Sequence, residues 1–427
     1  MASTSTEDKV YIALSDLAIG LYIDLELGWM EHPFSFSRFK IKSDKDIRII
    51  KSLKLKRVAV YPQRSDMLLF DTPATDSETP AENTRAEDEA LEAEQWEEKQ
   101  RQLEKSRQFH SKRREIAQKY NLASKQIKQV TSDLRHRPAN AIHDIDGIIT
   151  QLADTFEQGK DMLTQLVNLG NEDFSDFNHI TNVTMLSLML GSSLGLSGSD
   201  MKLLGTGALL HDIGKIEVPG GIRHKKTPLT HSEQEIFKRH TLYGRKLIER
   251  IKAMNVQVLN IIEQHHEYLD GSGYPKGLKG AQLAPLVRIV TITNLYDNLC
   301  NPPDISSAVT PKVALATLYH HFKNKLDREL VERLIGLLGV YPPGSVVKLN
   351  DETLGLVISA ASGAALAPCV LVYDADIPKQ QAQIINLQDF PELKIAEALN
   401  PGDFPPQIHQ YLGVQDRLSY LAESMTL

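Results

Sequence analysis

Two short motifs in the middle of the chain place imidazole and carboxylate side chains next to each other. The first is His211-Asp212, which continues as Ile-Gly-Lys215, and the second is His265-His266, which is followed by Glu267. Adjacent pairs of this kind are hard to explain by packing alone. Imidazole and carboxylate together form the ligand set that holds transition-metal ions and leaves positions open for water and substrate. The motifs therefore predict a metal centre that could activate water.

The expected helices between residues 140 and 340 each place candidate ligands on an apolar face. His179 shares such a face with Val183 and Leu186 at helical spacing. The other candidates in this pattern are His211, Asp212, His240, His265, His266 and Asn294. A single inward histidine is more often an ordinary core residue. Burying so many unpaired imidazoles would be unfavourable, however, and a shared metal centre supplies the missing partner.

Composition excludes several other classes of protein. The formal net charge of −7 disfavours binding to nucleic acid or to an anionic membrane. Only two cysteines are present, so a disulfide framework is not expected. The uncharged stretch 355–372 is interrupted by Gly363 and Pro368, which favours two strands over a membrane span. The N-terminus lacks the layout of a signal peptide, and we therefore expect a cytoplasmic location.

The pattern along the chain predicts a mainly α protein with four parts. Residues 8–70 read as a small α+β domain, with strands near 9–14, 20–25 and 56–61 and a helix over 44–53. Residues 71–135 read as an acidic linker to about Ala86 and a solvated helix over 87–120, which could pair two subunits as a homodimer. Residues 140–345 read as a helical domain.

The last part, residues 346–427, is predicted to be a short β-rich appendage. Strands are expected at 346–349, 354–360 and 369–373, with a final helix over 405–422. Nothing in this part indicates chemistry.

At residues 211–215 and 265–275 the sequence resembles the HD-GYP family, a branch of the HD superfamily of metal phosphohydrolases. The resemblance covers residues 140–345. Residues 8–70 also look like the small domain of unknown function that often precedes HD-GYP domains. The resemblance implies an all-helical domain with two, sometimes three, iron or manganese ions. It also implies hydrolysis of the bacterial second messenger cyclic di-GMP to the linear dinucleotide or GMP.

The resemblance implies a role for each motif residue. The expected metal ligands are His179, His211, Asp212, His240, His265 and His266, with Asn294 where the family has an Asp ligand. Asp212 would bridge the metals, and Lys215 would contact the scissile phosphate or the attacking water. Gly273, Tyr274 and Pro275 would shape the substrate loop and a surface for signalling partners. Two cations can clamp the attacking and leaving oxygens of a displacement at phosphorus, and a lysine can neutralise developing charge.

Three positions depart from the family pattern. Ser175 stands where members with three metals carry Glu, which favours two metals. Asn294 lacks the charge of Asp. The segment 299–304 has no Arg, where the family has a phosphate-gripping Arg. Three hypotheses therefore stay open: a two-metal cyclic di-GMP phosphodiesterase, a degenerate signalling module with little catalysis, and a phosphohydrolase for another nucleotide.

Overall fold

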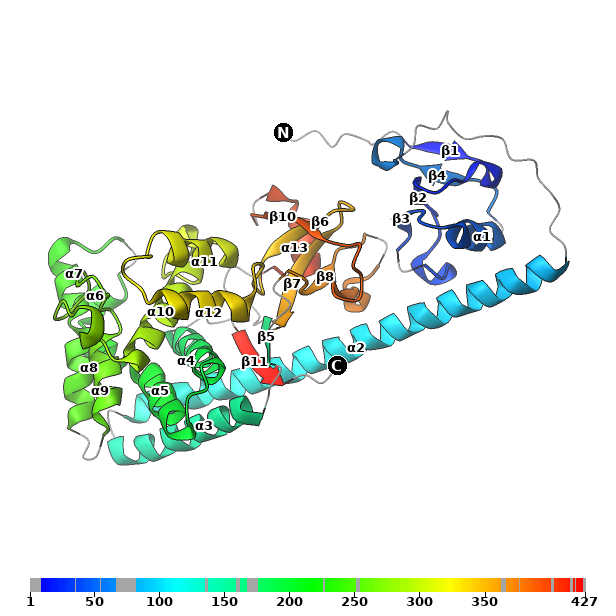
Figure 1. Cartoon of the computed structure of the whole chain (residues 1–427). Coiled ribbons are helices and arrows are strands. Elements are labelled where there is room, and N and C mark those ends of the chain that lie inside the picture. Colours follow the sequence, from blue (N-terminus) through cyan, green and yellow to red (C-terminus); the bar gives the residue numbers. More distant parts are fainter. Residues whose placement is uncertain are drawn as a thin grey trace. The chain divides into compact units, whose positions relative to one another are not determined.

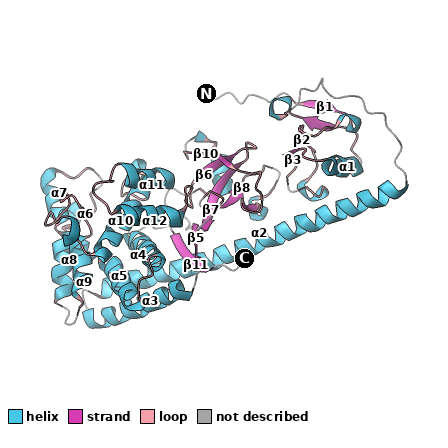
Figure 2. Cartoon of the chain, viewed as in Figure 1, coloured by secondary structure: helices cyan, strands magenta, loops and turns pink. Residues whose placement is uncertain are grey.

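The computed structural model describes most of the chain. The described residues are 9–34, 36–53, 55–66, 82–134, 137–158, 162–166, 176–225, 227–250, 254–361, 366–375, 377–400, 403–414, 418 and 420–424. They fall into two compact units, Met1–His110 with Asp374–Gln383, and Ser111–Tyr373 with Ile384–Leu427. Helices dominate the second unit, and a smaller group of strands lies beside them (Figure 2).

The first unit contains a four-stranded antiparallel sheet and one short helix. The strands are β1 (Val10–Ile12), β2 (Tyr22–Asp24), β3 (Arg38–Lys40) and β4 (Val58–Val60), in the order β1-β4-β2-β3. The helix α1 (Asp44–Ser52) starts at the capping residue Ser43 and buries Ile49 and Ile50 in the core beside Ile23. The predicted α+β domain is confirmed. Strand β3 was not predicted, because its Arg-Phe-Lys sequence carries a single apolar residue.

A long helix, α2 (Glu82–Asp133), follows. It is longer than the predicted helix over 87–120. Residues 82–86, predicted to be linker, are helical, and residues 71–81 lie outside the described part of the chain. The helix continues past Tyr120 because Ile127 and Val130 are buried in the core of the second unit.

The helices of the second unit surround one core. Ile149 of α3 (Pro138–Gln158), Ile180 of α4 (Asp176–Ser193), Leu209 of α5 (Gly198–Leu210) and Ile262 of α9 (Val256–Gln264) all belong to it. The other helices of this domain are α6 (Gly220–Arg223), α7 (His231–Lys238), α8 (His240–Glu249), α10 (Pro285–Cys300), α11 (Pro311–His320) and α12 (Arg328–Leu338) (Figure 1). No helix in the described ranges is long and apolar enough to cross a membrane.

A seven-stranded antiparallel sheet completes the second unit. Its strands are β5 (Met162–Leu166), β6 (Val346–Leu349), β7 (Leu354–Ala361), β8 (Cys369–Val372), β9 (Ile384–Asn386), β10 (Ile395–Leu399) and β11 (Tyr420–Ser424). The main path runs β10-β6-β7-β5-β11, and β8 pairs with both β7 and β9. The predicted strands β6, β7 and β8 are confirmed.

Two elements of this sheet differ from the prediction. The helix predicted over 405–422 is wrong: α13 spans only Pro406–Leu412 and ends at Gly413, whose φ is +68°. The chain then forms β11, which pairs with β5 in the register Tyr420 to Leu166. β5 itself lies in a stretch that was predicted to belong to a purely helical domain.

Candidate metal centre

The turn after α5 carries the His211-Asp212 pair. Ser197 caps α5 by accepting a hydrogen bond from the Asp200 N–H, and Leu204 on its inner face is fully buried. The α-helix ends at Leu210, and a 3-10 turn over Ile213–Glu217 follows. His211 is fully buried and Asp212 is 6% exposed. The end of α5 therefore points both side chains into the protein.

Gly214 lets α8 lie directly against this turn. A Cβ atom at Gly214 would lie 1.9 Å from the carbonyl oxygen of His240 and 2.3 Å from the nitrogen of Gly244. Only glycine permits such a close approach of two backbones. Helix α7 starts at a capping box formed by Thr230 and Glu233. It leads into α8, whose first residue is His240. The glycine of the first motif thus brings His240 beside Asp212.

Five histidines and one aspartate converge at this point from four segments: α4, the end of α5, the start of α8 and the end of α9. They form two groups, His179 with His211 and Asp212, and Asp212 with His240, His265 and His266. Within each group the potential ligand atoms lie within 4.8 Å of one another. The structure therefore brings six of the predicted ligands together, and Asp212 belongs to both groups.

In three of these histidines the ring nitrogen without a proton points toward the centre of the cluster. In His211, His240 and His265 the Nδ1 atom lies 2.6, 2.8 and 3.0 Å from a backbone carbonyl oxygen three residues earlier. Because a carbonyl can only accept, each Nδ1 carries the proton and each Nε2 is a bare acceptor. Yet the Nε2 atoms of His240 and His265 are only 3.4 Å apart. A cation is the partner that such clustered acceptors lack.

Asp212 adds the one carboxylate of the two groups. Its Oδ1 atom is buried and has no hydrogen-bond partner among the described residues. Burial opposes ionisation, but the charge of the neighbouring Lys215 ammonium group outweighs it and holds the pKa of Asp212 well below its usual value. Burial also lowers the pKa of His240 to about 4. Ionised carboxylate and neutral imidazole are the forms that bind metals, so the residues fit divalent cations.

Lys215 lies at the edge of the centre. The α-helix does not continue to it, and the 3-10 turn instead places its Nζ atom 2.5 Å from Oδ2 of Asp212. Its side chain is 22% exposed. The ammonium group is therefore within reach both of the candidate ligand Asp212 and of a molecule that enters from solvent.

The loop that carries Gly273, Tyr274 and Pro275 is held against the ligands by Glu267. The buried Glu267 carboxylate accepts three hydrogen bonds, at 2.6, 3.0 and 3.1 Å, from the backbone N–H groups of residues 276–278. A Cβ at Gly273 would lie 2.5 Å from the His266 carbonyl oxygen. This close approach lets the Tyr274 ring stack on His266, with ring centroids 4.6 Å apart. The Tyr274-Pro275 peptide bond is cis.

Asn294 lies on α10 and is 3% exposed. Its side-chain oxygen accepts a hydrogen bond of 2.8 Å from Asn298, one turn later on the same helix. Its role as a metal ligand stays a prediction.

Sequence reasoning missed the residues that hold His179. The Nδ1 atom of His179 lies 2.6 Å from Oδ2 of Asp297, which is fully buried. Asn182 and Asn301 each donate a hydrogen bond of 2.8 Å to the other oxygen of Asp297. Asp297 lies in the last turn of α10 and Asn301, four residues later, directly follows the helix; polar residues at that spacing after a buried helical pattern were the available signal.

Comparison with known proteins places these features in a family. Residues 153–330 match the model of the HD domain, and residues 9–145 match a domain of unknown function, DUF3391. The chain is similar to cyclic di-GMP phosphodiesterase PA4108 of Pseudomonas aeruginosa, with 26% identity over 226 residues, 53% of this chain and 54% of the relative. Further relatives also carry the name cyclic di-GMP phosphodiesterase.

Other relatives carry a different name. The chain is 31% identical to 3'3'-cGAMP-specific phosphodiesterase 2 of Vibrio cholerae over 190 residues, 43% of this chain and 36% of the relative. The chain thus spans about half the length, or less, of the curated relatives it matches. Among solved structures, Bd1817, an HDG"Y"P protein from Bdellovibrio bacteriovorus, matches with 17% identity and a TM-score of 0.44, over 77% of this chain and 98% of that chain.

The HD and Gly-Tyr-Pro motifs meet at one His and Asp cluster, and the family model covers the helices that carry most of it. Residues 153–330 therefore form an HD domain, and a DUF3391 domain lies ahead of it at residues 9–145.

Proposed function

We propose that this chain is a metal-dependent phosphodiesterase that hydrolyses cyclic di-GMP to the linear dinucleotide or GMP. The observation that supports it best is the sharing of Asp212 between two groups of ligands, since a shared carboxylate is the usual bridge in two-metal sites. The names of several relatives support the substrate.

We propose that the two groups hold two divalent cations, iron or manganese. His179 and His211 would hold one ion, His240, His265 and His266 the other, and Asp212 both; Asn294 would add an uncharged ligand. Such cations, when bound, supply a strong nucleophile from water near neutral pH and stabilise charge on phosphate oxygens.

The protein's own side chains have separate tasks in this reaction. Lys215 neutralises charge that develops on the phosphate in the transition state, because its ammonium group lies beside Asp212 and reaches solvent. Gly273, Tyr274 and Pro275 form the wall of the substrate site next to His266. Glu267 fixes that wall through the three backbone hydrogen bonds that it accepts.

Elemental analysis of anaerobically purified protein, with cyclic di-GMP turnover measured on the same sample, tests the proposal. We expect about two iron or manganese ions per chain and a linear product. Protein that holds both ions but leaves cyclic di-GMP intact would overturn the substrate assignment. A panel that includes 3'3'-cGAMP would then show whether another cyclic dinucleotide is the substrate, as the name of one relative suggests.

A second candidate function rests on two departures from the family pattern. Asn294 replaces a charged ligand, and no Arg follows Asp297 through residue 304. These changes favour a signalling module that binds other proteins and catalyses little. Protein that binds at most one ion and shows no turnover would support this candidate over the enzyme.

A further inference from the structure

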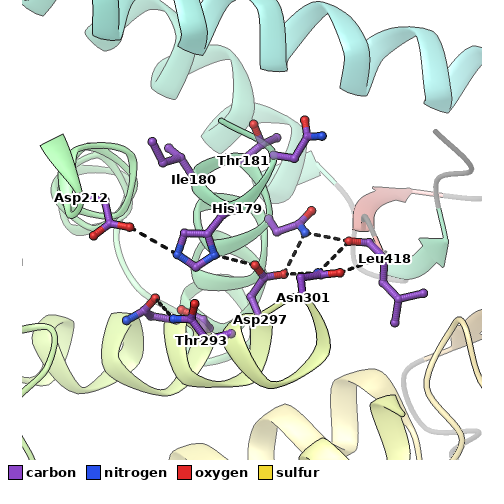
Figure 3. A network of polar contacts seen from close by, with 12 residues as sticks. His179, Ile180, Thr181, Asp212, Thr293, Asp297, Asn301 and Leu418 are labelled. Atoms are coloured by element: carbon purple, nitrogen blue, oxygen red, sulfur yellow. Dashed lines mark hydrogen bonds and ion pairs between the residues drawn. The ribbon is translucent and has the colours of Figure 1, made fainter. Parts of the chain in front are cut away.

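A network of buried hydrogen bonds links His179 to the far end of the chain. Asp297 accepts from His179 through Oδ2 and from the amides of Asn182 and Asn301 through Oδ1. Figure 3 shows Asp212, His179, Asp297, Asn301 and Leu418 in succession along these contacts. The Asp297 carboxylate thus binds the Nδ1 side of His179, a predicted metal ligand.

The same two amides also hold the backbone of Leu418. The Nδ2 atoms of Asn182 and Asn301 each lie 2.9 Å from the Leu418 carbonyl oxygen. The Leu418 N–H in turn donates a hydrogen bond of 2.7 Å to Oδ1 of Asn301. All the atoms involved belong to residues that are less than 9% exposed. Leu418 lies two residues before β11, whose pairing with β5 anchors this segment.

These contacts fix which way the amides face. Each NH2 group has two hydrogens; it donates one to the Asp297 carboxylate and the other to the Leu418 carbonyl oxygen. A flipped amide of Asn301 would point its oxygen at the Asp297 carboxylate and its NH2 group at the Leu418 N–H. Two buried acceptors would then face each other, and so would two buried donors. Because unsatisfied buried polar groups are costly, the Leu418 backbone selects the orientation that stabilises Asp297.

We propose that the segment at Leu418 is a positioning element of the metal centre. Its backbone orients Asn301 and, together with the Tyr120 hydroxyl that donates to Oδ1 of Asn182, also holds Asn182. These amides hold Asp297, and Asp297 fixes the tautomer and ring orientation of His179. The proposal rests on the metal-dependent function argued above. It assigns to the C-terminal appendage, in which the sequence indicates no chemistry, a specific effect on one of the two ligand groups. Leu418 is a positioning residue and touches no reacting atom.

Leu418→Pro tests the proposal, because proline removes the N–H that binds Asn301. Leu418→Ala is the matched comparison, since it removes the same buried side chain but keeps the N–H and the carbonyl. Mn²⁺ binding to the full chain is measured by titration calorimetry. We expect the ion at the His179 group to bind about 10- to 100-fold more weakly in Leu418→Pro than in Leu418→Ala.

The group of His240, His265 and His266 serves as an internal control. A general loss of structure would weaken the binding of both ions, whereas a specific effect would weaken only the ion at the His179 group. The Nδ1 atoms of His240 and His265 bind carbonyls of their own segments and not this network. Leu418→Pro should therefore weaken the binding of one ion and leave the binding of the other unchanged, the same pattern that we expect for His179→Ala. If Leu418→Pro does not fold, Asn301→Ala removes the amide that joins Leu418 to Asp297, at the residue that follows α10, and is measured in the same way.

Equal weakening of both ions, or equal affinities in the Pro and Ala variants, would overturn the proposal. A measurement on metal-free protein tests the role of Leu418 independently of the proposed phosphodiesterase activity. Histidine-selective ¹⁵N NMR of metal-free protein should show His179 as the Nδ1–H tautomer in Leu418→Ala and as a mixture in Leu418→Pro; the same tautomer in both would overturn it. Wild-type protein that binds two ions without hydrolysing cyclic di-GMP would contradict only the proposed activity.

Discussion

The Nδ1 atom of His179 and the Oδ2 atom of Asp297 lie 2.6 Å apart, although the two residues are 118 positions apart in the chain. A carboxylate in this place makes the imidazole a better ligand and holds its ring in one orientation. Asp297→Asn keeps an acceptor but removes the charge. We expect Mn²⁺ to bind the His179 group about 10- to 100-fold more weakly, as measured by calorimetry. Asp304→Asn, an exposed residue past the same helix, is the control; equal effects of the two changes would contradict this role.

Asp212 is the one residue that both ligand groups use. Asp212→Ala should therefore abolish the binding of both ions and all turnover. His179→Ala should weaken only the binding of the ion at its own group. Metal content by elemental analysis after gel filtration distinguishes the two variants. Turnover that survives in Asp212→Ala would exclude the two-metal mechanism.

Asn294→Asp restores the charge that the family has at this position. If Asn294 faces the ions, a carboxylate there should raise metal affinity at least about tenfold, because charge-assisted contacts are roughly twice as strong as neutral ones. Asn255→Asp, at the exposed N-cap of α9, makes the same change in net charge away from the centre. An affinity and a turnover rate that match this control would mean that Asn294 does not limit activity.

Glu267 is fully buried and accepts three backbone hydrogen bonds from residues 276–278. Glu267→Ala leaves these part-buried donors without their acceptor, and a buried group left without a partner costs about 1–3 kcal/mol. Because water can reach part of this loop, the free energy of unfolding of the second unit should fall by about 1–3 kcal/mol in urea denaturation. Glu267→Gln keeps one oxygen and should lose less. Equal stability of the Ala variant and the wild type would show that the loop is held by other contacts.

His32 makes the first unit sensitive to acid. Burial, aided by the charge of Lys99, lowers the pKa of His32 to about 4. Between about pH 6.5 and 4 the unfolded chain therefore binds a proton that the folded unit does not, and stability falls as the pH drops through this window, by up to about 1.4 kcal/mol per pH unit. Urea denaturation of the first unit at pH 7, 6 and 5 measures the slope. His32→Gln should flatten it, and an unchanged slope would assign it to other groups.

Local patterns in the sequence predicted much of the fold and of the site. The apolar spacing around His179 and the two motifs depend on neighbours within a few turns, so they indicated the helices and the ligands together. The strands β6, β7 and β8 were visible for the same reason, as apolar runs between turns.

Contacts between distant segments could not be predicted in this way. Strand β11 forms because Tyr420–Ser424 meets β5, more than 250 residues earlier, and its own sequence does not determine that pairing. Asp297 carries no motif of its own, and its partner His179 lies on another helix. Asn182 and Asn301 look like ordinary helical polar residues until the fold brings both to one carboxylate and one carbonyl.

The shared use of Asp212 also affects how the centre would interact with small anions. The two groups contain a single carboxylate among neutral imidazoles, far less negative charge than two divalent cations bring in positive charge. A loaded centre would therefore remain strongly cationic, with the Lys215 ammonium group adding to it. We infer that inorganic phosphate and sulfate would compete with a phosphodiester for this site. Inhibition by the buffer anion, rather than by the nucleotide product alone, would then set the apparent activity in phosphate-containing media.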